Sequence, residues 1–396
     1  MPKIKVMFPR VEAGFGHIMT CNAVEEIFSR KYGDKFEIIN INFFAEAEDE
    51  KVKKLGEKLK KAVRTYTSKP LVGHFATFNC EFWGTDLSTW GSMRFLVPGS
   101  AKKGVEFLQT FNPDVVFSTH WATNYYAEQM EKKPFTVMYC PDALLNKLFK
   151  YRADLSLVSM ETGYIEAKKD TSYNSQNLKL VPFCIRNDAF DLKDDKMTSR
   201  KKLGLPMDKF TVVLAEGGYG RGAMKDICTR LVKEHIPVTV IPVCGKNKEL
   251  LEYFKGLKPT EEVTFLPQGF ITNIFEYLNS ADLFCGKAGN MIAEPTFFGV
   301  PSIITGTSTS IETNIGDYYI NYVHCAVKQF NHKKVVKMIK NLVKDPSVLV
   351  PYQKAAKDHH SSYGAEATAD ILFEAIVKRF PQVLKEDSEE NKQWIM

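Results

Sequence analysis

The chain has 396 residues, of which 44% are hydrophobic and 25% charged, and its formal net charge is +6. This length favours two domains of ordinary size, and the composition excludes a largely disordered chain. The charge excess is modest, so we expect no nucleic-acid partner, although it is compatible with an anionic membrane surface or an anionic substrate. No two of the eight cysteines form a C-x-x-C pair, which argues against a zinc site and a disulfide framework.

Short apolar runs alternate with helical stretches along almost the whole chain. The predicted strands are Ile4–Phe8, Phe36–Phe43, Asp114–Ser118, Phe135–Cys140, Asp154–Val158, Phe210–Ala215, Pro237–Val243, Glu262–Leu266, Ala281–Cys285 and Val300–Ile304. Strand–helix alternation of this kind predicts an α/β chain with parallel sheets that helices cover on both faces.

A charged stretch without a strand pattern, Asn187–Lys202, separates the two series of strands. We place the linker there and expect an N-terminal Rossmann-like domain over residues 1–188 and a second one over residues 189–365. Residues 366–396 should form a C-terminal helix that packs back toward the N-terminal domain, followed by a polar tail.

The first predicted strand ends in the glycine-bearing turn Ala13–His17, which leads into a helix. In an open α/β sheet, ligands bind at the carboxyl ends of the strands. His17 could act there as a general base or hydrogen-bond donor, or it could simply cap the helix of a tight turn. Asp142, which follows the strand Phe135–Cys140, is our second candidate base, although Pro141-Asp142 is equally typical of a turn.

The segment Lys51–Arg64 carries seven basic residues against the single acid Glu57, with apolar residues at helical spacing. Thr65–Ser100 follows, with many aromatic residues and no clear periodicity, and we expect irregular structure there. The two segments are either an interfacial element for an anionic membrane or a solvated helix leading into a core-filling loop. Because neither a signal pattern nor a membrane-spanning apolar stretch is present, we expect a cytoplasmic protein, soluble or peripheral to the membrane.

Two turns in the second half follow predicted strands. In the turn Glu216–Gly222, Gly217 and Gly218 could admit a diphosphate, and Arg221 could neutralise it. Lys246 follows the next strand, where it lies either beside the same sheet edge or in solvent.

The most specific stretch is Cys285–Glu294, in which a strand ends at a glycine-bearing turn and a helix begins. The backbone N–H groups of Gly289 and Asn290 could receive phosphate oxygens there. Glu294 could accept both hydroxyls of a ribose, although an acid at a helix start is also stabilised by the helix dipole.

These motifs together resemble the C-terminal half of the monogalactosyldiacylglycerol synthases and bacterial processive diacylglycerol glucosyltransferases, with the peptidoglycan lipid N-acetylglucosaminyl transferase as a more distant relative. The resemblance rests on Lys287-Ala288-Gly289 and Ile292-Ala293-Glu294, on Cys244–Lys248 and on Gly269-Phe270. It covers residues 210–315 and, more loosely, residues 1–185 through Gly16-His17 and Asn112-Pro113-Asp114.

The resemblance implies a GT-B architecture, in which two Rossmann-like domains present their parallel sheets to a central cleft that holds the donor. It also implies an inverting hexosyltransferase that uses a UDP-sugar as co-substrate, a lipid acceptor such as diacylglycerol, and neither a cofactor nor a metal. Such an enzyme would be peripheral to the cytoplasmic face of a membrane.

The same resemblance assigns roles to individual residues. The diphosphate would face Gly217 and Gly218 and the turn formed by Lys287, Ala288, Gly289 and Asn290. Independently of the resemblance, Lys246, Lys287 or Arg221 could stabilise the charge that develops on the leaving group. The uracil would meet the main chain of Phe270 and Ile271, the ribose would bind Glu294, and Glu312 and Asn314 would read the sugar hydroxyls. His17 would lie at the acceptor side with Gly14, Phe15 and Gly16.

Two features depart from the family pattern. Phe15 stands where the family has a glycine, which should narrow the cleft or change the shape of the acceptor. Pro295 directly follows Glu294, lacks an N–H, and disfavours helical geometry at Glu294. A transferase with a soluble or other lipid-linked acceptor, and an inactive family member that acts as a binding module, therefore stay open as alternatives.

Overall fold

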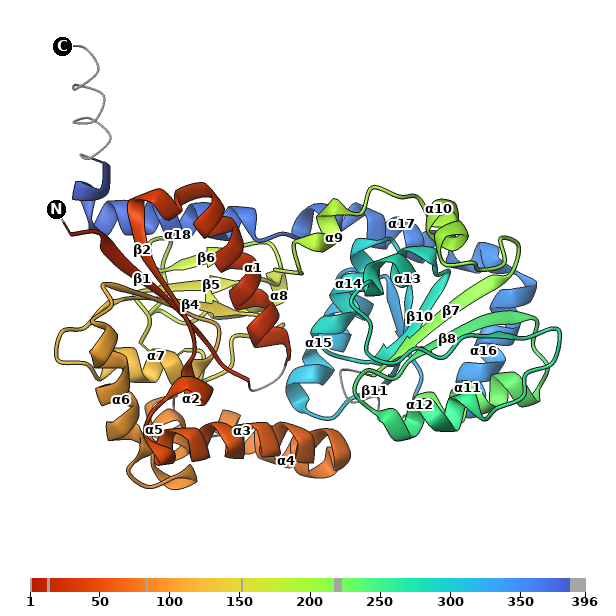
Figure 1. Cartoon of the computed structure of the whole chain (residues 1–396), viewed down its shortest axis with the longest axis horizontal. Coiled ribbons are helices and arrows are strands. Elements are labelled where there is room, and N and C mark those ends of the chain that lie inside the picture. Colours follow the sequence, from red (N-terminus) through yellow and green to blue (C-terminus); the bar gives the residue numbers. More distant parts are fainter. Residues whose placement is uncertain (1, 13–14, 83–84, 151, 217–222, 385–396) are drawn as a thin grey trace, which may run out of the picture. The chain divides into compact units, whose positions relative to one another are not determined.

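The computed structural model describes residues 2–12, 15–82, 85–150, 152–216 and 223–384. The chain divides into two compact units (Figure 1). The first comprises residues 1–64, 76–186 and 364–396, and the second comprises residues 65–75 and 187–363. Each unit is built on one parallel sheet, as the strand–helix alternation predicts.

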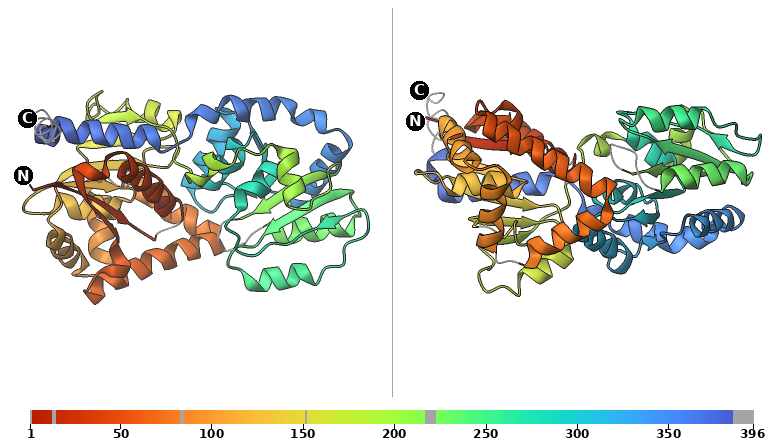
Figure 2. Two further views of the ribbon diagram at one scale, coloured as in Figure 1. Left: turned by 45° about the horizontal axis from the view of Figure 1, so that its top comes forward. Right: turned by 90° about the horizontal axis from the view of Figure 1, so that it is seen from below.

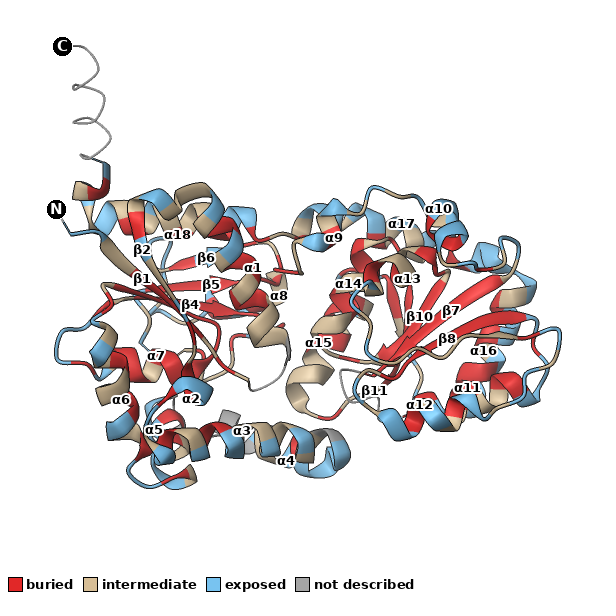
Figure 3. Cartoon of the chain, in the orientation of Figure 1, coloured by how far each residue is buried: buried red, intermediate tan, exposed pale blue. Residues whose placement is uncertain are grey.

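The sheet of the first unit has its strands in the order β2-β1-β3-β4-β5-β6, with parallel neighbours throughout. The bounds are β1 Ile4–Arg10, β2 Phe36–Asn42, β3 Val115–Ser118, β4 Phe135–Cys140, β5 Leu155–Val158 and β6 Leu178–Leu180. The central strands β3, β4 and β5 consist almost entirely of buried residues (Figure 3). Burial of this kind is typical of parallel strands that are covered on both faces.

One face of this sheet is covered by α1 (Phe15–Tyr32) and α18 (Glu366–Arg379), which bury Phe28 and Leu372 against it. The two helices also contact each other (Figure 2). The rings of Tyr32 and Phe373 stack with their centroids 4.0 Å apart, and Lys31 pairs with Asp370 at 2.5 Å. The C-terminal helix therefore belongs to the core of the first unit.

The opposite face is covered by a larger group of helices, whose apolar side chains share one core with the sheet. They are α2 Phe43–Glu46, α3 Glu50–Ser68, α5 Thr85–Leu96, α6 Ser100–Phe111 and α7 Trp121–Glu128. The helix α8 (Glu161–Ala167) connects β5 to β6.

Residues 65–100, for which we predicted irregular structure, are largely helical. The helix α3 runs on to Ser68, and α4 (Pro70–Phe82) and α5 follow it. The prediction was wrong because large apolar side chains lie on the solvent side of these helices: Phe75 is 72% exposed and Phe95 is 75% exposed. Apolar residues on the solvent side erase the helical spacing that marks a buried face.

The sheet of the second unit has the order β12-β11-β10-β7-β8-β9. The bounds are β7 Phe210–Ala215, β8 Val238–Val243, β9 Thr264–Phe265, β10 Leu283–Lys287, β11 Ser302–Gly306 and β12 Ala326–Lys328. When the strands are numbered within the unit and read from the β9 edge, this is the 3-2-1-4-5-6 order of dinucleotide-binding folds.

The helices α11 (Met224–Lys233), α12 (Lys248–Lys255) and α16 (His332–Lys344) share one hydrophobic core with this sheet. The other α-helices of the unit are α9 Asp188–Asp191, α10 Lys196–Lys202, α13 Ile274–Ser280, α14 Ala293–Phe297, α15 Ser310–Asn321 and α17 Val350–Asp358. Short 3-10 helices are η1 Gly33–Lys35, η2 Asn290–Ile292, η3 Pro346–Leu349, η4 His360–Ser362 and η5 Pro381–Leu384.

The stretch chosen as the linker contains α9 and α10 and is anchored to the second unit. Arg200 of α10 is buried, and its guanidinium donates to Asp282 at 2.6 Å and to Ser280 O at 3.0 Å. Asp282 in turn accepts the N–H of Thr211 at 2.8 Å. This charge pair and its hydrogen bonds tie the stretch to the sheet of the second unit.

Candidate active site

Each sheet has one point at which the strand order reverses. In the first unit the neighbours at this point are β1 and β3, and in the second unit they are β7 and β10. Ligands of open α/β sheets bind beyond the carboxyl ends of the strands at such a point. The candidate site residues should therefore follow these four strands.

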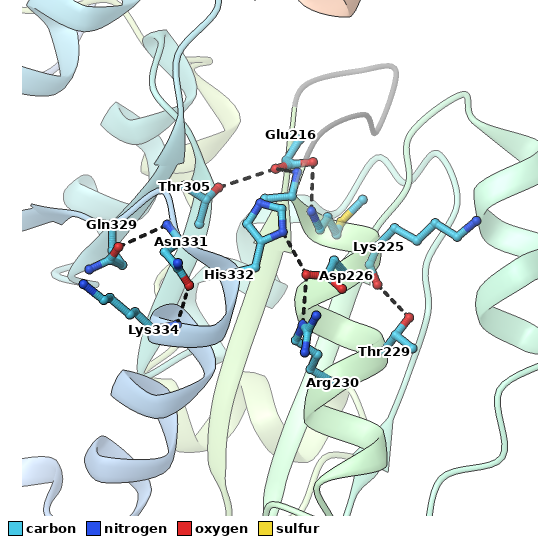
Figure 4. Close-up of polar contacts among 12 residues, drawn as sticks. Glu216, Lys225, Asp226, Thr229, Arg230, Thr305, Gln329, Asn331, His332 and Lys334 are labelled. Carbon is cyan, nitrogen blue, oxygen red and sulfur yellow. Dashed lines mark hydrogen bonds and ion pairs between the residues drawn. The ribbon is translucent and has the colours of Figure 1, made fainter.

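Directly after β7, Glu216 carries a buried carboxylate, with only 4% of the residue exposed. Its oxygens accept the N–H of Ala223 at 2.8 Å, the N–H of Met224 at 3.1 Å and the Thr305 hydroxyl at 3.4 Å (Figure 4). Burial raises the pKa of Glu216 to about 7, although the hydrogen bonds act in the opposite direction. Two N–H groups at the start of α11 thus have a partner within the chain.

A second polar cluster lies further along α11 (Figure 4). Asp226 accepts a hydrogen bond from Arg230 Nε at 2.9 Å and pairs with His332 Nδ1 at 2.9 Å. The Arg230 guanidinium, with a smaller contribution from His332, holds the pKa of Asp226 below its ordinary value. Because His332 is the first residue of α16, this cluster joins α11 to α16, and we assign it a structural role.

Lys287 is the last residue of β10. Its Nζ lies 2.5 Å from Glu312 Oε1 and 3.4 Å from Ser308 Oγ. Glu312 also accepts the N–H of Ser308 at 2.5 Å, while the Thr309 hydroxyl oxygen accepts the N–H of Glu312 at 3.1 Å. The Thr309 hydroxyl thus caps the start of α15. Glu312, predicted to read sugar hydroxyls, already makes an ion pair and a backbone hydrogen bond, and the half-buried Asn314 lies on the same helix.

The turn after β10 brings the other predicted phosphate ligands to the same sheet edge. Ala288 donates its N–H to Gly306 O at 2.9 Å, so this group is engaged. Gly289 has φ 146° and ψ −177°, a conformation essentially restricted to glycine. The Oδ1 of Asn290 is enclosed and has no hydrogen-bond partner among the residues that the structure describes. Because buried polar atoms normally have a partner, this oxygen is a point at which a ligand donor fits.

Glu294 lies within α14 and is half-buried. We expected Pro295 to disfavour helical geometry at Glu294, and this expectation is wrong. The helix begins at Ala293, so Pro295 falls in the first turn, where a missing N–H leaves no intrahelical bond unmade. The Glu294 carboxylate therefore keeps its place just after the β10 turn.

Lys246 and the loop of Phe270 and Ile271 come together beyond the end of β8. The N–H of Cys244 donates to Gln268 O at 2.8 Å, which ties this loop to the end of the strand. Lys246 Nζ lies 5.7 Å from the centroid of the Phe270 ring, and Phe270 is 62% exposed. The main chain predicted to receive uracil and the lysine predicted to lie at the sheet edge are thus neighbours.

Several predicted site residues lie outside the described residues. They are Gly14, Gly217, Gly218 and Arg221. Phe15 is the first residue of α1, but its side chain is also outside the described part of the chain, and Gly16 follows it in the helix.

In the first unit, His17 of α1 contacts the residue that follows β3. Its Nδ1 lies 2.7 Å from Thr119 O, and the Thr119 hydroxyl donates to His17 O at 2.9 Å. Burial lowers the pKa of His17 below its ordinary value of 6.5, and the bond to the Thr119 carbonyl opposes this shift only in part. The imidazole is therefore neutral near pH 7, as a general base must be.

Asp142, the second candidate base, follows β4 and is buried. Asn146 Nδ2 donates to Asp142 Oδ2 at 3.1 Å, and Asn146 Oδ1 accepts the N–H of Phe149 at 3.4 Å. The Phe149 ring stacks on His17 with the ring centroids 6.1 Å apart. This chain of contacts favours a positioning role for Asp142 over the role of base.

Two residues of these clusters were not predicted from the sequence. His120 follows β3 by two residues and accepts the N–H of Ala122 at 3.2 Å, and Glu216 directly follows β7. Both satisfy the rule that selected His17, because each is a titratable side chain at the carboxyl end of a strand next to the reversal point.

No model of a known protein family matches the chain. A probable monogalactosyldiacylglycerol synthase from Nicotiana tabacum is 21% identical over 327 residues, which are 76% of this chain and 58% of that protein. The structure of MurG from Acinetobacter baumannii superposes with a TM-score of 0.59 at 11% identity, covering 94% of this chain and 100% of that one. The chain has the GT-B glycosyltransferase fold.

The GT-B fold and the resemblance to monogalactosyldiacylglycerol synthases, both predicted from the sequence, are thereby confirmed. A UDP-GlcNAc 2-epimerase from Neisseria meningitidis, bound to UDP-GlcNAc, shares the GT-B fold with a TM-score of 0.58 at 12% identity, covering 96% of this chain and 100% of that one. The chain spans between 58% and 64% of the length of the curated relatives that it matches.

Proposed function

We propose that this chain is an inverting, metal-independent glycosyltransferase that moves a hexose from a UDP-sugar to a lipid acceptor such as diacylglycerol on the cytoplasmic face of a membrane. The observation that carries the proposal is the group of Lys287, Gly289, Asn290 and Glu294 beyond the reversal point of the second sheet. The similarity to monogalactosyldiacylglycerol synthases supports it.

In this proposal the second unit binds the donor. The N–H groups of Gly289 and Asn290 receive phosphate oxygens, and Lys287 and Lys246 stabilise the charge that develops on the leaving diphosphate. The carboxylate of Glu294 accepts the two ribose hydroxyls. The main chain of Phe270 and Ile271 receives the uracil, Gly217, Gly218 and Arg221 complete the diphosphate site, and Glu312 and Asn314 meet the hexose.

The first unit binds the acceptor. The Nε2 of His17 takes the proton of the acceptor hydroxyl as the oxygen attacks the anomeric carbon. The bond from that carbon to the diphosphate breaks with its electrons on the departing UDP. A single displacement of this kind inverts the anomeric configuration and needs a base at the acceptor but no metal.

Purified protein should release UDP from UDP-glucose or UDP-galactose in the presence of diacylglycerol, and chelation with EDTA should leave this release unchanged. The variant Glu294→Gln should raise the dissociation constant of UDP about 10- to 100-fold, because a charged acceptor of two hydroxyl bonds is lost. Calorimetric titration with UDP measures this change. The matched control is Glu261→Gln, since Glu261 is exposed in the same unit.

The outcomes of this test separate the proposal from its alternatives. If UDP is released only with a water-soluble acceptor, the chain is a transferase whose acceptor is soluble and not a lipid. Release of UDP without any acceptor, together with an altered sugar, would indicate an epimerase on the same fold. Failure of every UDP-sugar to bind would contradict the proposal as a whole.

The proposal of a membrane partner is based on the side chains that α3, α4 and α5 expose. The helix α3 carries the basic segment 51–64, and a surface groove is lined by Lys54, Glu57, Lys58, Lys60, Lys61 and Arg64. Within the same unit, the end of α4 and the helix α5 expose large apolar side chains, namely Phe78, Leu87, Trp90 and Phe95. Basic and exposed apolar side chains on neighbouring helices are the combination that binds anionic bilayers. Within the described part of the chain, none of the helices combines the length and apolar character needed to cross a bilayer.

Reversal of charge on this surface should abolish flotation of the protein with liposomes that contain anionic lipid. We choose Lys54→Glu, Lys58→Glu and Lys61→Glu in one variant, because these three side chains are exposed. Each basic residue near an anionic surface contributes about 1 kcal/mol, so the binding constant should fall by more than 100-fold. A variant with three exposed lysines reversed in the second unit, Lys248, Lys255 and Lys333, is the control. Equal flotation of both variants would contradict the assigned surface.

A further inference from the structure

A half-buried imidazole, His17, and a buried one, His120, meet in the first unit, next to the reversal point of its sheet. The rings of His17 and His120 lie edge to face, with their centroids 5.1 Å apart and an angle of 84° between the ring planes. Phe149 stacks on His17, and the Trp121 ring lies 5.1 Å from His120. Both aromatic neighbours are buried, so they hold the two imidazoles in fixed orientations.

The backbone contacts of the two rings determine where each ring carries its proton. His17 Nδ1 lies 2.7 Å from Thr119 O, and a carbonyl oxygen only accepts, so Nδ1 holds the hydrogen and Nε2 keeps its lone pair. His120 Nδ1 lies 3.2 Å from the Ala122 nitrogen, whose N–H only donates. The neutral His120 ring therefore carries its hydrogen on Nε2.

Both rings are neutral near pH 7, since burial lowers the pKa of His17 and lowers that of His120 well below its ordinary value. The pair thus presents one nitrogen that accepts a proton and one N–H that donates a hydrogen bond. A hydroxyl group has the complementary pattern, because its hydrogen donates while its oxygen accepts.

We propose that His120 binds the acceptor hydroxyl, donating its Nε2–H to the hydroxyl oxygen that His17 deprotonates. This inference rests on the proposed transferase function and adds a residue to its acceptor site. One lone pair of the oxygen is then held by His120, the O–H bond points at His17 Nε2, and the remaining lone pair attacks the anomeric carbon. The proton passes to His17, and the bonding electrons of the sugar–phosphate bond leave with UDP.

The simpler role of His120 is to cap α7 through its contact with Ala122. Two substitutions separate the roles. In His120→Asn the side-chain oxygen takes the place of Nδ1 and keeps the cap, for which asparagine is among the best residues, but the Nε2 donor is lost. In His120→Gln the amide nitrogen takes the place of Nε2, so the donor is kept.

The expected result is that His120→Asn unfolds at the unchanged temperature and binds UDP with unchanged affinity, while kcat/KM for the acceptor falls about 10- to 100-fold. His120→Gln should recover part of this loss. Full acceptor activity in His120→Asn would overturn the inference, as would an activity loss that matches a lowered unfolding temperature in both variants. Long-range ¹⁵N–¹H correlation spectra report the tautomers irrespective of activity, and a hydrogen on His120 Nδ1 would also overturn it.

Failure of the proposed function can be distinguished from failure of the proposed role of His120. An unmodified chain that transfers no sugar from any UDP-sugar would overturn the transferase proposal, and the role of His120 with it, before any variant is compared. An active unmodified chain whose His120→Asn variant is equally active overturns the role of His120 alone.

Discussion

Replacement of His17 by asparagine should lower kcat for glycosyl transfer by about 10²- to 10⁴-fold, the usual contribution of a general base. The asparagine amide can still donate to Thr119 O, as His17 Nδ1 does at 2.7 Å. The substitution therefore removes the Nε2 lone pair while keeping the contact that orients the side chain. Initial rates of UDP release with saturating donor and acceptor measure the effect.

The internal control for this variant is donor binding, which should be unchanged because His17 lies in the first unit. The pH profile gives a second test. Burial lowers the pKa of His17 below 6.5, so the unmodified chain should lose kcat/KM only as the pH falls below that value. In His17→Asn we expect kcat/KM to be low at every pH and to show no further fall at acid pH. Full activity of the variant would contradict the assignment of His17 as the base.

Replacement of Glu216 by glutamine should change the stability of the second unit in a pH-dependent way. As the pH rises, the unfolding free energy of the variant should increase relative to that of the unmodified chain. The pKa of Glu216 is raised from 4.5 to about 7 by burial, so the folded state binds a proton that the unfolded state has released between these two values. The stability of the unmodified chain therefore declines as pH rises from 4.5 through 7 and stays at the lower level above it. The glutamine variant has no such decline at this position.

Between pH 5.5 and pH 8.5 the difference in unfolding free energy between the variant and the unmodified chain should change by about 2 kcal/mol in favour of the variant. In a unit of this size the change corresponds to about 4–8 °C in unfolding temperature. Loss of one hydrogen bond to Ala223 or Met224 lowers the stability of the variant equally at both pH values, so only the change with pH is diagnostic.

The control for this measurement is again Glu261→Gln, whose carboxylate is exposed in the same unit. Thermal unfolding followed by circular dichroism at several pH values gives the required comparison. A pH-independent difference between Glu216→Gln and the unmodified chain would show that Glu216 is ionised in the folded state throughout this range.

The sequence was most informative where strands are buried on both faces. The predicted strands Phe135–Cys140 and Phe210–Ala215 have the bounds of β4 and β7, because continuous apolar runs mark such strands. The edge strands β6 and β12 were not predicted, since three residues are too few to show a pattern. The helices α4 and α5 were missed because several of their apolar residues are exposed to solvent, so their apolar residues do not mark one buried helix face.

For the candidate site, the sequence predicted glycine turns at the carboxyl ends of strands, and the described turn at Ala288-Gly289 does follow β10. Strand–helix alternation predicts this placement, because it makes the strands parallel and brings their carboxyl ends to one edge of the sheet. The pairings of side chains were not predictable. Lys287 meets Glu312, and Glu216 meets Thr305, only because segments far apart in the sequence approach each other, and no local spacing encodes that approach.

The position of Glu216 has a consequence for how tightly the protein can hold nucleotides. A carboxylate attached to the chain competes with any dissolved phosphate for the N–H groups of Ala223 and Met224, and its tethering gives it a high effective concentration at that spot. A nucleotide that used these groups would have to displace the tethered anion first, and it would do so more easily once Glu216 has taken up a proton. Acidification toward pH 6 should therefore tighten such binding, which is the opposite of the trend set by the ionisation of the phosphate itself.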